Sequence, residues 1–174
     1  MEEQAEDEDK LWNGLKEALE GAFRQFVETR TAEGENLKKD LLEKLSYLEC
    51  QVGKVEERSP QIVAEYRAKL EAKVKELLED VQIDESRIAA EVILFADKIC
   101  TDEETVRLKS HITSMLNALE RSEGIGRKLD FIAQEMNREA NTTLSKINDV
   151  TLADLAIDMK TEIEKIREQV QNIE

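Results

Sequence analysis

Large apolar side chains recur every three or four residues through the first third of the chain. They form one run: Leu11, Leu15, Leu19, Phe23, Phe26, Leu37, Leu41, Leu45, Leu48, Val52 and Val55. This spacing returns to one side of an α-helix and does not match the two-residue period of a strand. We therefore predict a single helix of about 45 residues over 10–57, roughly 65 to 70 Å long at 1.5 Å per residue.

The dipeptide Ser59-Pro60 follows this run. Ser is a favoured N-cap residue, and Pro is favoured at the first helical position, where its missing N–H breaks no hydrogen bond. We predict that a second helix starts here, continues to about Asp80 and folds back on the first. Residues 10–82 would then form a long antiparallel helical hairpin, or arm.

Four shorter helices are predicted after the arm, over residues 85–99, 102–121, 126–147 and 151–171. Asp84 is in position to cap the first, and Thr101 with Glu104 has the spacing of a capping box at the start of the second. A single Pro, 6 Gly and 4% aromatic residues argue against a sheet-rich fold. The predicted fold is all-α, with the hairpin arm followed by a compact helical bundle, a four-helix domain at 83–174.

Charge is distributed unevenly along the chain. Its 25 basic and 40 acidic residues give a net charge of −15, which disfavours attraction of the whole chain to nucleic acid or to an anionic membrane. Six acidic residues lie within 2–9, and their mutual repulsion predicts that residues 1–9 are disordered. The segment 105–148 is different, because its seven basic and five acidic side chains give a local charge of +2.

The cysteines and the apolar segments indicate the compartment. Cys50 and Cys100 lack metal-ligand spacing, and no apolar run reaches 18 residues. With no signal peptide recognised in the sequence, we expect a cytoplasmic protein that does not bind membranes.

The segment GRKLDFIAQEMNREANTTLSK (126–146) has amides where a soluble helix usually carries Glu and Lys. Its apolar residues, from Leu129 to Ile147, predict the side that faces the core. A second stripe can direct hydrogen bonds to a nucleic acid, a buried network or a neighbouring subunit. It consists of Asp130, Gln134, Asn137, Arg138, Asn141 and Ser145, whereas Lys128, Glu135 and Lys146 point to another side.

His111 is the only histidine of the chain. It shares a helix face with Glu104 and Arg107, because these residues are three and four positions apart. Such a set can transfer protons and neutralise charge at a phosphodiester, but a surface histidine in a salt-bridged helix has the same pattern.

Metal and phosphate sites have only weak signals. No HExxH, CxxC or EF-hand spacing occurs, so a metal would rest on scattered carboxylates. Examples are Glu91, Asp97, Glu104 and Glu135. The stretch GIGRK (124–128) opens a helix and could hold a phosphate through its free N–H groups and two cations, although GxG is also a common turn.

Four segments, taken in order, resemble the C-terminal region of the YicC-like (YloC-like) bacterial endoribonucleases. They are EVILFADK (91–98), RLKSH (107–111), GRKLDFIAQEMNREANTTLSK (126–146) and EKIREQVQNIE (164–174). The stretch TRTAEG (29–34) resembles that family's central helical arm. The resemblance implies a cytoplasmic homo-oligomer that cleaves RNA with a divalent cation, Mg or Mn, and whose arms assemble around RNA. It also implies an N-terminal domain ahead of the matched region.

On this resemblance we predict the C-terminal part of an endoribonuclease that binds and cleaves single-stranded or structured RNA, without DNA specificity. The catalytic candidates are His111, Glu91, Glu104 and Glu135, and the metal candidates are Glu91, Asp97 and Asp130. The RNA-binding candidates are Arg107, Arg127, Lys128, Gln134, Asn137, Arg138, Asn141 and Lys146.

Two routes of cleavage remain open, one through the RNA 2′-hydroxyl with a Glu–His pair and one through a metal-held water. The alternative function is a helical scaffold that assembles chains or binds RNA without cutting it.

Overall fold

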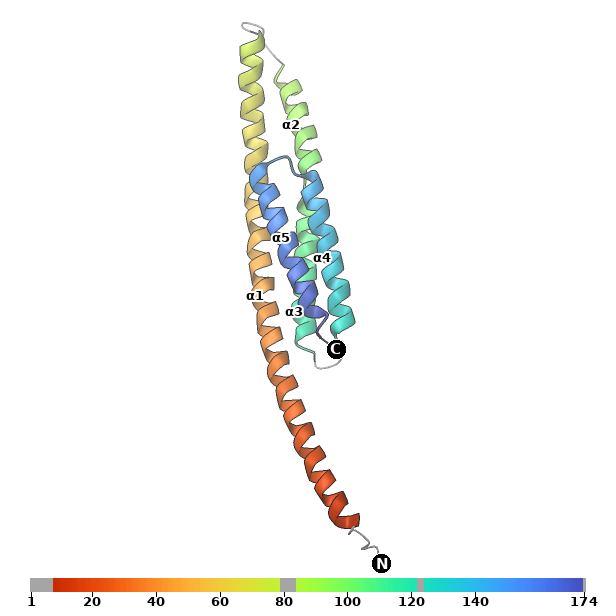
Figure 1. The fold of residues 1–174 in the computed structure, drawn as a ribbon. Coiled ribbons are helices and arrows are strands. Elements are labelled where there is room, and N and C mark those ends of the chain that lie inside the picture. Colours follow the sequence, from red (N-terminus) through yellow and green to blue (C-terminus); the bar gives the residue numbers. More distant parts are fainter. Residues whose placement is uncertain (1–7, 79–83, 122–123, 174) are drawn as a thin grey trace, which may run out of the picture. The chain divides into compact units, whose positions relative to one another are not determined.

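The computed structural model describes residues 8–78, 84–121 and 124–173. Within these residues the protein has five α-helices and no strand, which confirms the all-α prediction (Figure 1). The helices are α1 (Glu8–Leu78), α2 (Glu85–Ile99), α3 (Asp102–Leu119), α4 (Gly126–Lys146) and α5 (Val150–Val170). None of the helices in the described ranges is both long and apolar enough to span a bilayer.

The predicted hairpin within 10–82 is wrong, because α1 continues through Ser59 and Pro60. The Ser59 hydroxyl donates to the carbonyl oxygen of Val55 at 2.8 Å, as Ser often does inside a helix. Pro60 removes a backbone hydrogen bond, which costs about 3 kcal/mol in a helix interior. Burial on both sides, at Val55 (0% exposed) and Ile62 (8%), outweighs this loss.

The chain instead reverses direction between α1 and α2, as Figure 1 shows. Tyr66 of α1 stacks on Phe95 of α2 with ring centroids 3.7 Å apart, and its hydroxyl donates to Glu91 at 3.3 Å. The antiparallel neighbour of the C-terminal part of α1 is therefore α2, and not the part of α1 before Ser59.

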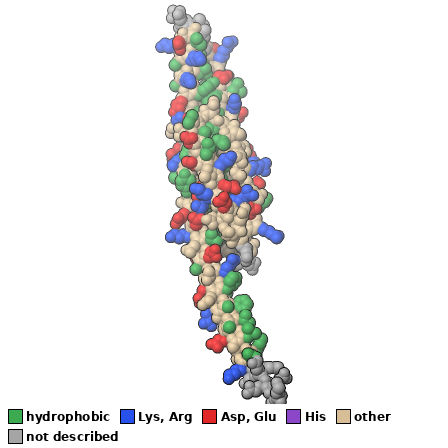
Figure 2. Space-filling view, viewed as in Figure 1, with side chains coloured by type: hydrophobic (Ala, Val, Ile, Leu, Met, Phe, Trp, Pro, Cys, Tyr) green, Lys and Arg blue, Asp and Glu red, His purple; other side chains and the backbone are tan. Residues whose placement is uncertain are grey.

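The chain divides into two units, Met1–Asp40 and Leu41–Glu174. In the first unit, Glu8 and Asp9 are already helical, and the rest of the predicted disordered segment 1–9 lies outside the described residues. Seven large apolar side chains of this unit are 46–66% exposed, and Figure 2 shows apolar side chains along this part of α1. We call them the N-terminal apolar stripe: Leu11, Trp12, Leu15, Leu19, Phe23, Phe26 and Val27.

The second unit is a helical bundle in which α1, from Leu41 onward, packs with the later helices. Lys44 of α1 pairs with Glu162 of α5 at 3.2 Å, and Arg58 pairs with Asp149 at 2.9 Å, so the two helices are antiparallel. The largest core side chains that are at most 1% exposed come from α1, α3, α4 and α5: Leu41, Leu45, Leu48, Leu108, Met115, Leu129, Met136, Met159, Ile163 and Ile166. The predicted domain 83–174 supplies α2 to α5, and the apolar face of α1 closes the bundle.

Asp149 begins α5 and also ties it to α1. Its carboxylate accepts a hydrogen bond from the backbone N–H of Leu152 at 3.0 Å, as an N-cap does. The hydrogen bond from the Arg58 guanidinium lowers the pKa of the Asp149 carboxyl, so the cap stays ionised at neutral pH.

Replacing Leu45 by Ala should lower the free energy of unfolding by about 2–5 kcal/mol, because it opens a cavity in the core. Leu77→Ala is the matched control on the same helix, at a site that is 69% exposed, and should change it by less than about 0.5 kcal/mol. Urea denaturation followed by circular dichroism measures both. Equal effects of the two substitutions would contradict the placement of Leu45 in the core.

Candidate active site at the contact between α3 and α4

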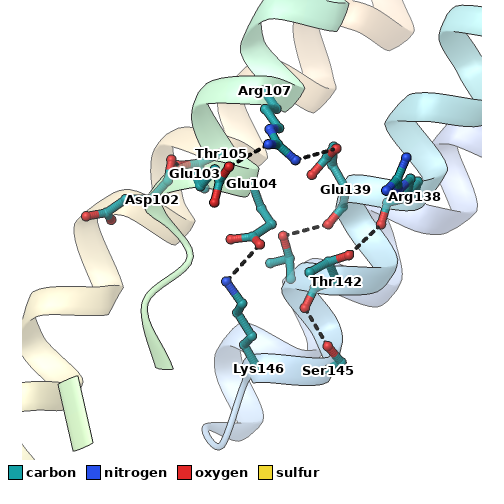
Figure 3. A network of polar contacts seen from close by, with 11 residues as sticks. Asp102, Glu103, Glu104, Thr105, Arg107, Arg138, Glu139, Thr142, Ser145 and Lys146 are labelled. Atoms are coloured by element: carbon teal, nitrogen blue, oxygen red, sulfur yellow. Dashed lines mark hydrogen bonds and ion pairs between the residues drawn. The ribbon is translucent and has the colours of Figure 1, made fainter. Parts of the chain in front are cut away.

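Polar side chains line one side of the contact between α3 and α4 (Figure 3). We call this set the α3–α4 seam: Glu104, Arg107 and His111 from α3, and Glu135, Glu139 and Lys146 from α4. Spacings of three, four and seven residues return to one side of a helix, so each set forms a row. Because the helices are antiparallel, Glu104 meets Lys146 and Arg107 meets Glu139.

The apolar core lies directly beside the seam. Ile112 of α3 and Met136 of α4 are at most 2% exposed, and they neighbour seam residues in the sequence. Glu104 and Glu139 are consequently only 6% and 4% exposed. Buried carboxylates are costly unless they are paired, and both of these have a cationic partner across the helix contact.

His111, Glu135 and Glu139 form a group of potential metal ligands. One ligand atom from each residue lies within 4.8 Å of the other two, and His111 and Glu135 are half-buried. One imidazole nitrogen and two carboxylate oxygens suit a first-row divalent ion such as Mn²⁺, whereas Mg²⁺ prefers oxygen ligands. The same groups can also exchange protons with a substrate.

Arg107 lies beside this group and remains accessible to solvent. Its Nη1 is 3.7 Å from Glu139 Oε1, its Nη2 donates to Glu103, and its side chain is 53% exposed. A guanidinium has five N–H donors, so these two contacts leave donors for a phosphate.

Lys146 binds Glu104 across the two helices, with its Nζ 2.8 Å from Oε1. The second carboxylate oxygen, Oε2, is buried and has no hydrogen-bond partner among the described residues. The hydrogen bond to Glu104 raises the pKa of Lys146, so the lysine stays charged. The predicted capping box of Thr101 and Glu104 is wrong, because Glu104 turns towards Lys146 and Thr101 makes no side-chain cap.

The structure brings some of the predicted catalytic residues together. His111 and Glu135 belong to one group, and Glu104 lies in the same seam. Glu91 is exposed on α2 and belongs neither to the group around His111 nor to the α3–α4 seam. The sequence prediction missed Glu139, although its position four residues after Glu135 placed it on the same side of the helix.

The predicted metal ligands Glu91, Asp97 and Asp130 do not form a ligand group. Glu91 and Asp97 are exposed on α2, and Asp130 of α4 accepts a hydrogen bond from Arg167 of α5 at 3.4 Å. In the described part of the chain, the group that satisfies metal-ligand distances is the one around His111.

The predicted amide stripe of α4 lies on a different side from the seam. Gln134 donates to Asp130 at 2.7 Å, and Asn141 donates to Asn137 at 3.5 Å, so part of its hydrogen bonding runs along the helix. The contact of Asp130 with Arg167 shows that this stripe borders α5, whereas the seam borders α3.

The predicted basic contacts are spread along α4. Arg127 and Lys128 are exposed in its first turn, Lys146 is in its last turn, and the helix has 21 residues, or about 30 Å. Arg138 lies between them, with its Nη1 3.8 Å from Glu135.

The histidine and the carboxylates can transfer protons, and the exposed arginine can neutralise charge at a phosphate, and phosphodiester cleavage needs both. The family model described as "Endoribonuclease YicC-like, C-terminal" matches residues 55–174. The chain therefore belongs to the YicC-like endoribonuclease family, which confirms the resemblance seen in the sequence.

Two curated relatives agree with this assignment. The chain is 45% identical over 175 residues to a protein of Clostridioides difficile (strain 630) named "Probable endoribonuclease YicC". It is 34% identical over 176 residues to a protein of the same name from Haemophilus influenzae. Both alignments cover 100% of this chain and 60% of the relative, so the chain spans about 60% of the length of these proteins.

Replacing Lys146 by Ala should lower the free energy of unfolding by about 1–3 kcal/mol, because it leaves the Glu104 carboxylate buried without its cation. The double change Glu104→Gln with Lys146→Gln should recover part of this loss. Lys165→Ala is the matched control, since Glu162 keeps its pair with Lys44.

Chemical denaturation of these variants measures the differences. If Lys146→Ala lowers the free energy of unfolding no more than Lys165→Ala does, Lys146 does not compensate a buried charge on Glu104.

Proposed function

We propose that this chain supplies the RNA-cleaving site of a cytoplasmic endoribonuclease, and that the site is the α3–α4 seam around His111. The observation that carries the proposal is the meeting of His111, Glu135 and Glu139 beside Arg107. Cleavage of a phosphodiester needs proton transfer and neutralisation of charge at phosphorus, and these side chains can do both. This chain spans 60% of the length of its relatives, which are named as probable endoribonucleases over their whole length. That this part of the sequence carries the cleaving residues is therefore our proposal.

Each residue has a role that follows from its surroundings. Arg107 binds the phosphate, because its guanidinium is exposed and has donors left after its contacts with Glu103 and Glu139. His111 transfers a proton, because imidazole is the side chain that most often serves as general acid or base, and it lies within the group formed with Glu135 and Glu139. Glu139 is buried and in contact with Arg107, so it holds the guanidinium next to the imidazole.

His111, Glu135 and Glu139 are also the residues that would hold a divalent cation. Their mixed nitrogen and oxygen donors favour Mn²⁺ over Mg²⁺. A bound cation would neutralise charge on the phosphate and make a water more acidic. The contact between Arg107 and Glu139 links the ligand group to the phosphate-binding guanidinium.

The two routes of cleavage give different products. In the first, the 2′-oxygen of RNA attacks phosphorus after losing its proton to one protein group, and the 5′-oxygen leaves with a proton from another. The chain has one histidine, so a single chain cannot supply two, and we assign the second group to a glutamate of the seam. This route leaves a 2′,3′-cyclic phosphate, whereas attack by water leaves a linear phosphate.

Replacing His111 by Ala should abolish tight Mn²⁺ binding and reduce cleavage of labelled RNA by about 10²-fold or more, because both need the imidazole. Glu139→Gln should weaken both as well. Asn117→Ala, an exposed site on the same helix, is the matched control and should change neither.

Isothermal titration with MnCl₂ and gel analysis of RNA products measure the two effects on this chain. Unchanged Mn²⁺ binding and unchanged turnover in the His111 variant would remove the imidazole from the site.

We further propose that two copies of the chain associate through the N-terminal apolar stripe. Seven large apolar side chains exposed within 17 residues form a surface of the kind that mediates protein association. The segment 10–30 has four basic and three acidic residues, a net charge of +1 in a chain of −15. Two copies of this segment therefore do not repel each other strongly, and this favours a second copy as the occupant.

The double substitution Leu15→Glu with Phe23→Glu should convert the assembly to a monomer of 19.9 kDa, because it places charges in the apolar contact. Leu77→Glu, also at an exposed apolar site of α1, should leave the assembly intact. Light scattering after size-exclusion chromatography measures the mass. A wild-type chain that is monomeric at all concentrations would refute association through the stripe.

A further inference from the structure

A cavity of about 550 Å³ lies between α1, α2 and the C-terminal end of α4. Its walls combine rings, cations and neutral hydrogen-bonding groups. The residues that matter for its chemistry are Tyr66, Glu91, Phe95, Lys98, Lys146 and Asn148. The cavity is of the size at which proteins bind small organic groups.

The apolar part of the cavity is a pair of stacked rings. Tyr66 and Phe95 lie with their centroids 3.7 Å apart and their planes 10° from parallel, and both side chains are half-buried. They are two of the seven aromatic residues of the chain. Each ring covers one face of the other, so a nucleobase would stack on an outer face of the pair, and every base offers a π-face.

The polar part of the cavity matches the rest of a nucleotide. Lys98 and Lys146 contribute two cations to the lining, against the single carboxylate of Glu91. Lysines bind phosphate oxygens, whereas a carboxylate and the Asn148 amide bind the polar edge of a base. Lys146 also pairs with Glu104, so Lys98 is the cation of the lining that Glu104 does not neutralise.

The cavity shares one residue, Lys146, with the α3–α4 seam. Lys146 lines the cavity and also binds Glu104, which lies on α3 one turn before Arg107.

We propose that this cavity is a nucleotide subsite, which binds one base of the RNA strand next to the bond that is cut. The proposal rests on RNA cleavage at the α3–α4 seam. The base stacks on the pair of Tyr66 and Phe95, and its phosphate binds Lys98 and Lys146.

The test is RNA binding by this chain, measured with a short oligonucleotide that carries one 2-aminopurine. Phe95→Leu removes the π-face but keeps an apolar side chain, and it should weaken binding about 5- to 100-fold and reduce the change in fluorescence. Lys98→Gln should weaken binding and lower its dependence on salt by about one phosphate contact. Phe131→Leu, at an exposed aromatic site of α4, is the matched control and should bind as wild type does.

The outcomes separate the two proposals. If wild type binds and cuts RNA while Phe95→Leu and Lys98→Gln bind it equally well, only the subsite is overturned. If wild type binds no RNA, the proposed function fails and the subsite with it. If adenosine monophosphate binds as tightly as the oligonucleotide, the cavity takes a free nucleotide, and its assignment to the RNA strand is overturned. Thermal unfolding of each variant checks that its fold is intact.

Discussion

The antiparallel packing of α3 against α4 is the contact on which the candidate site depends. The histidine of the ligand group comes from α3 and its two carboxylates, Glu135 and Glu139, come from α4. Ile112 of α3 and Met136 of α4 are both buried in the core. The polar rows beside them meet across the helix contact, as the pairs of Arg107 with Glu139 and Glu104 with Lys146 in Figure 3 show. A site built in this way requires the folded bundle, including the core positions that α1 contributes.

Burial of charge distinguishes the seam from an ordinary surface network. Glu104 and Glu139 are 6% and 4% exposed, and each has its cationic partner on the opposite helix. A buried ion pair often stabilises a protein no better than a well-packed apolar pair, so such pairs are weak devices for stability alone. The seam is better understood as a way to hold charged groups in fixed positions. Lys146 extends this arrangement to the neighbouring cavity, which it also lines.

Helix periodicity predicted much of the fold. The predicted helix 85–99 coincides with α2 (Glu85–Ile99), because a cap at Asp84 and a continuous apolar stripe agree there. At Pro60 the local signal and the apolar period conflict, and the period prevailed because burial of α1 in the bundle outweighs one lost hydrogen bond. The partner of a helix is not encoded in its period, so the pairing of α1 with α2 could not be read from the sequence.

Helix periodicity also predicted part of the candidate site. His111 and Arg107 share a helix face, and Glu135 lies off the amide stripe, both of which follow from residue spacing. The association of His111 with Glu139 depends on the register between two helices, which the sequence does not state. The predicted ligands Glu91 and Asp97 lie on α2, whereas the ligand group is formed by α3 and α4.

The central claim is that His111, Glu135 and Glu139 act together as the cation-binding centre of an RNA-cleaving site. Crystals grown with Mn²⁺ and measured at the manganese absorption edge test it directly. The account predicts an anomalous difference peak enclosed by the imidazole of His111 and the carboxylates of Glu135 and Glu139. Manganese bound elsewhere on the chain, with no peak between these three side chains, would contradict it.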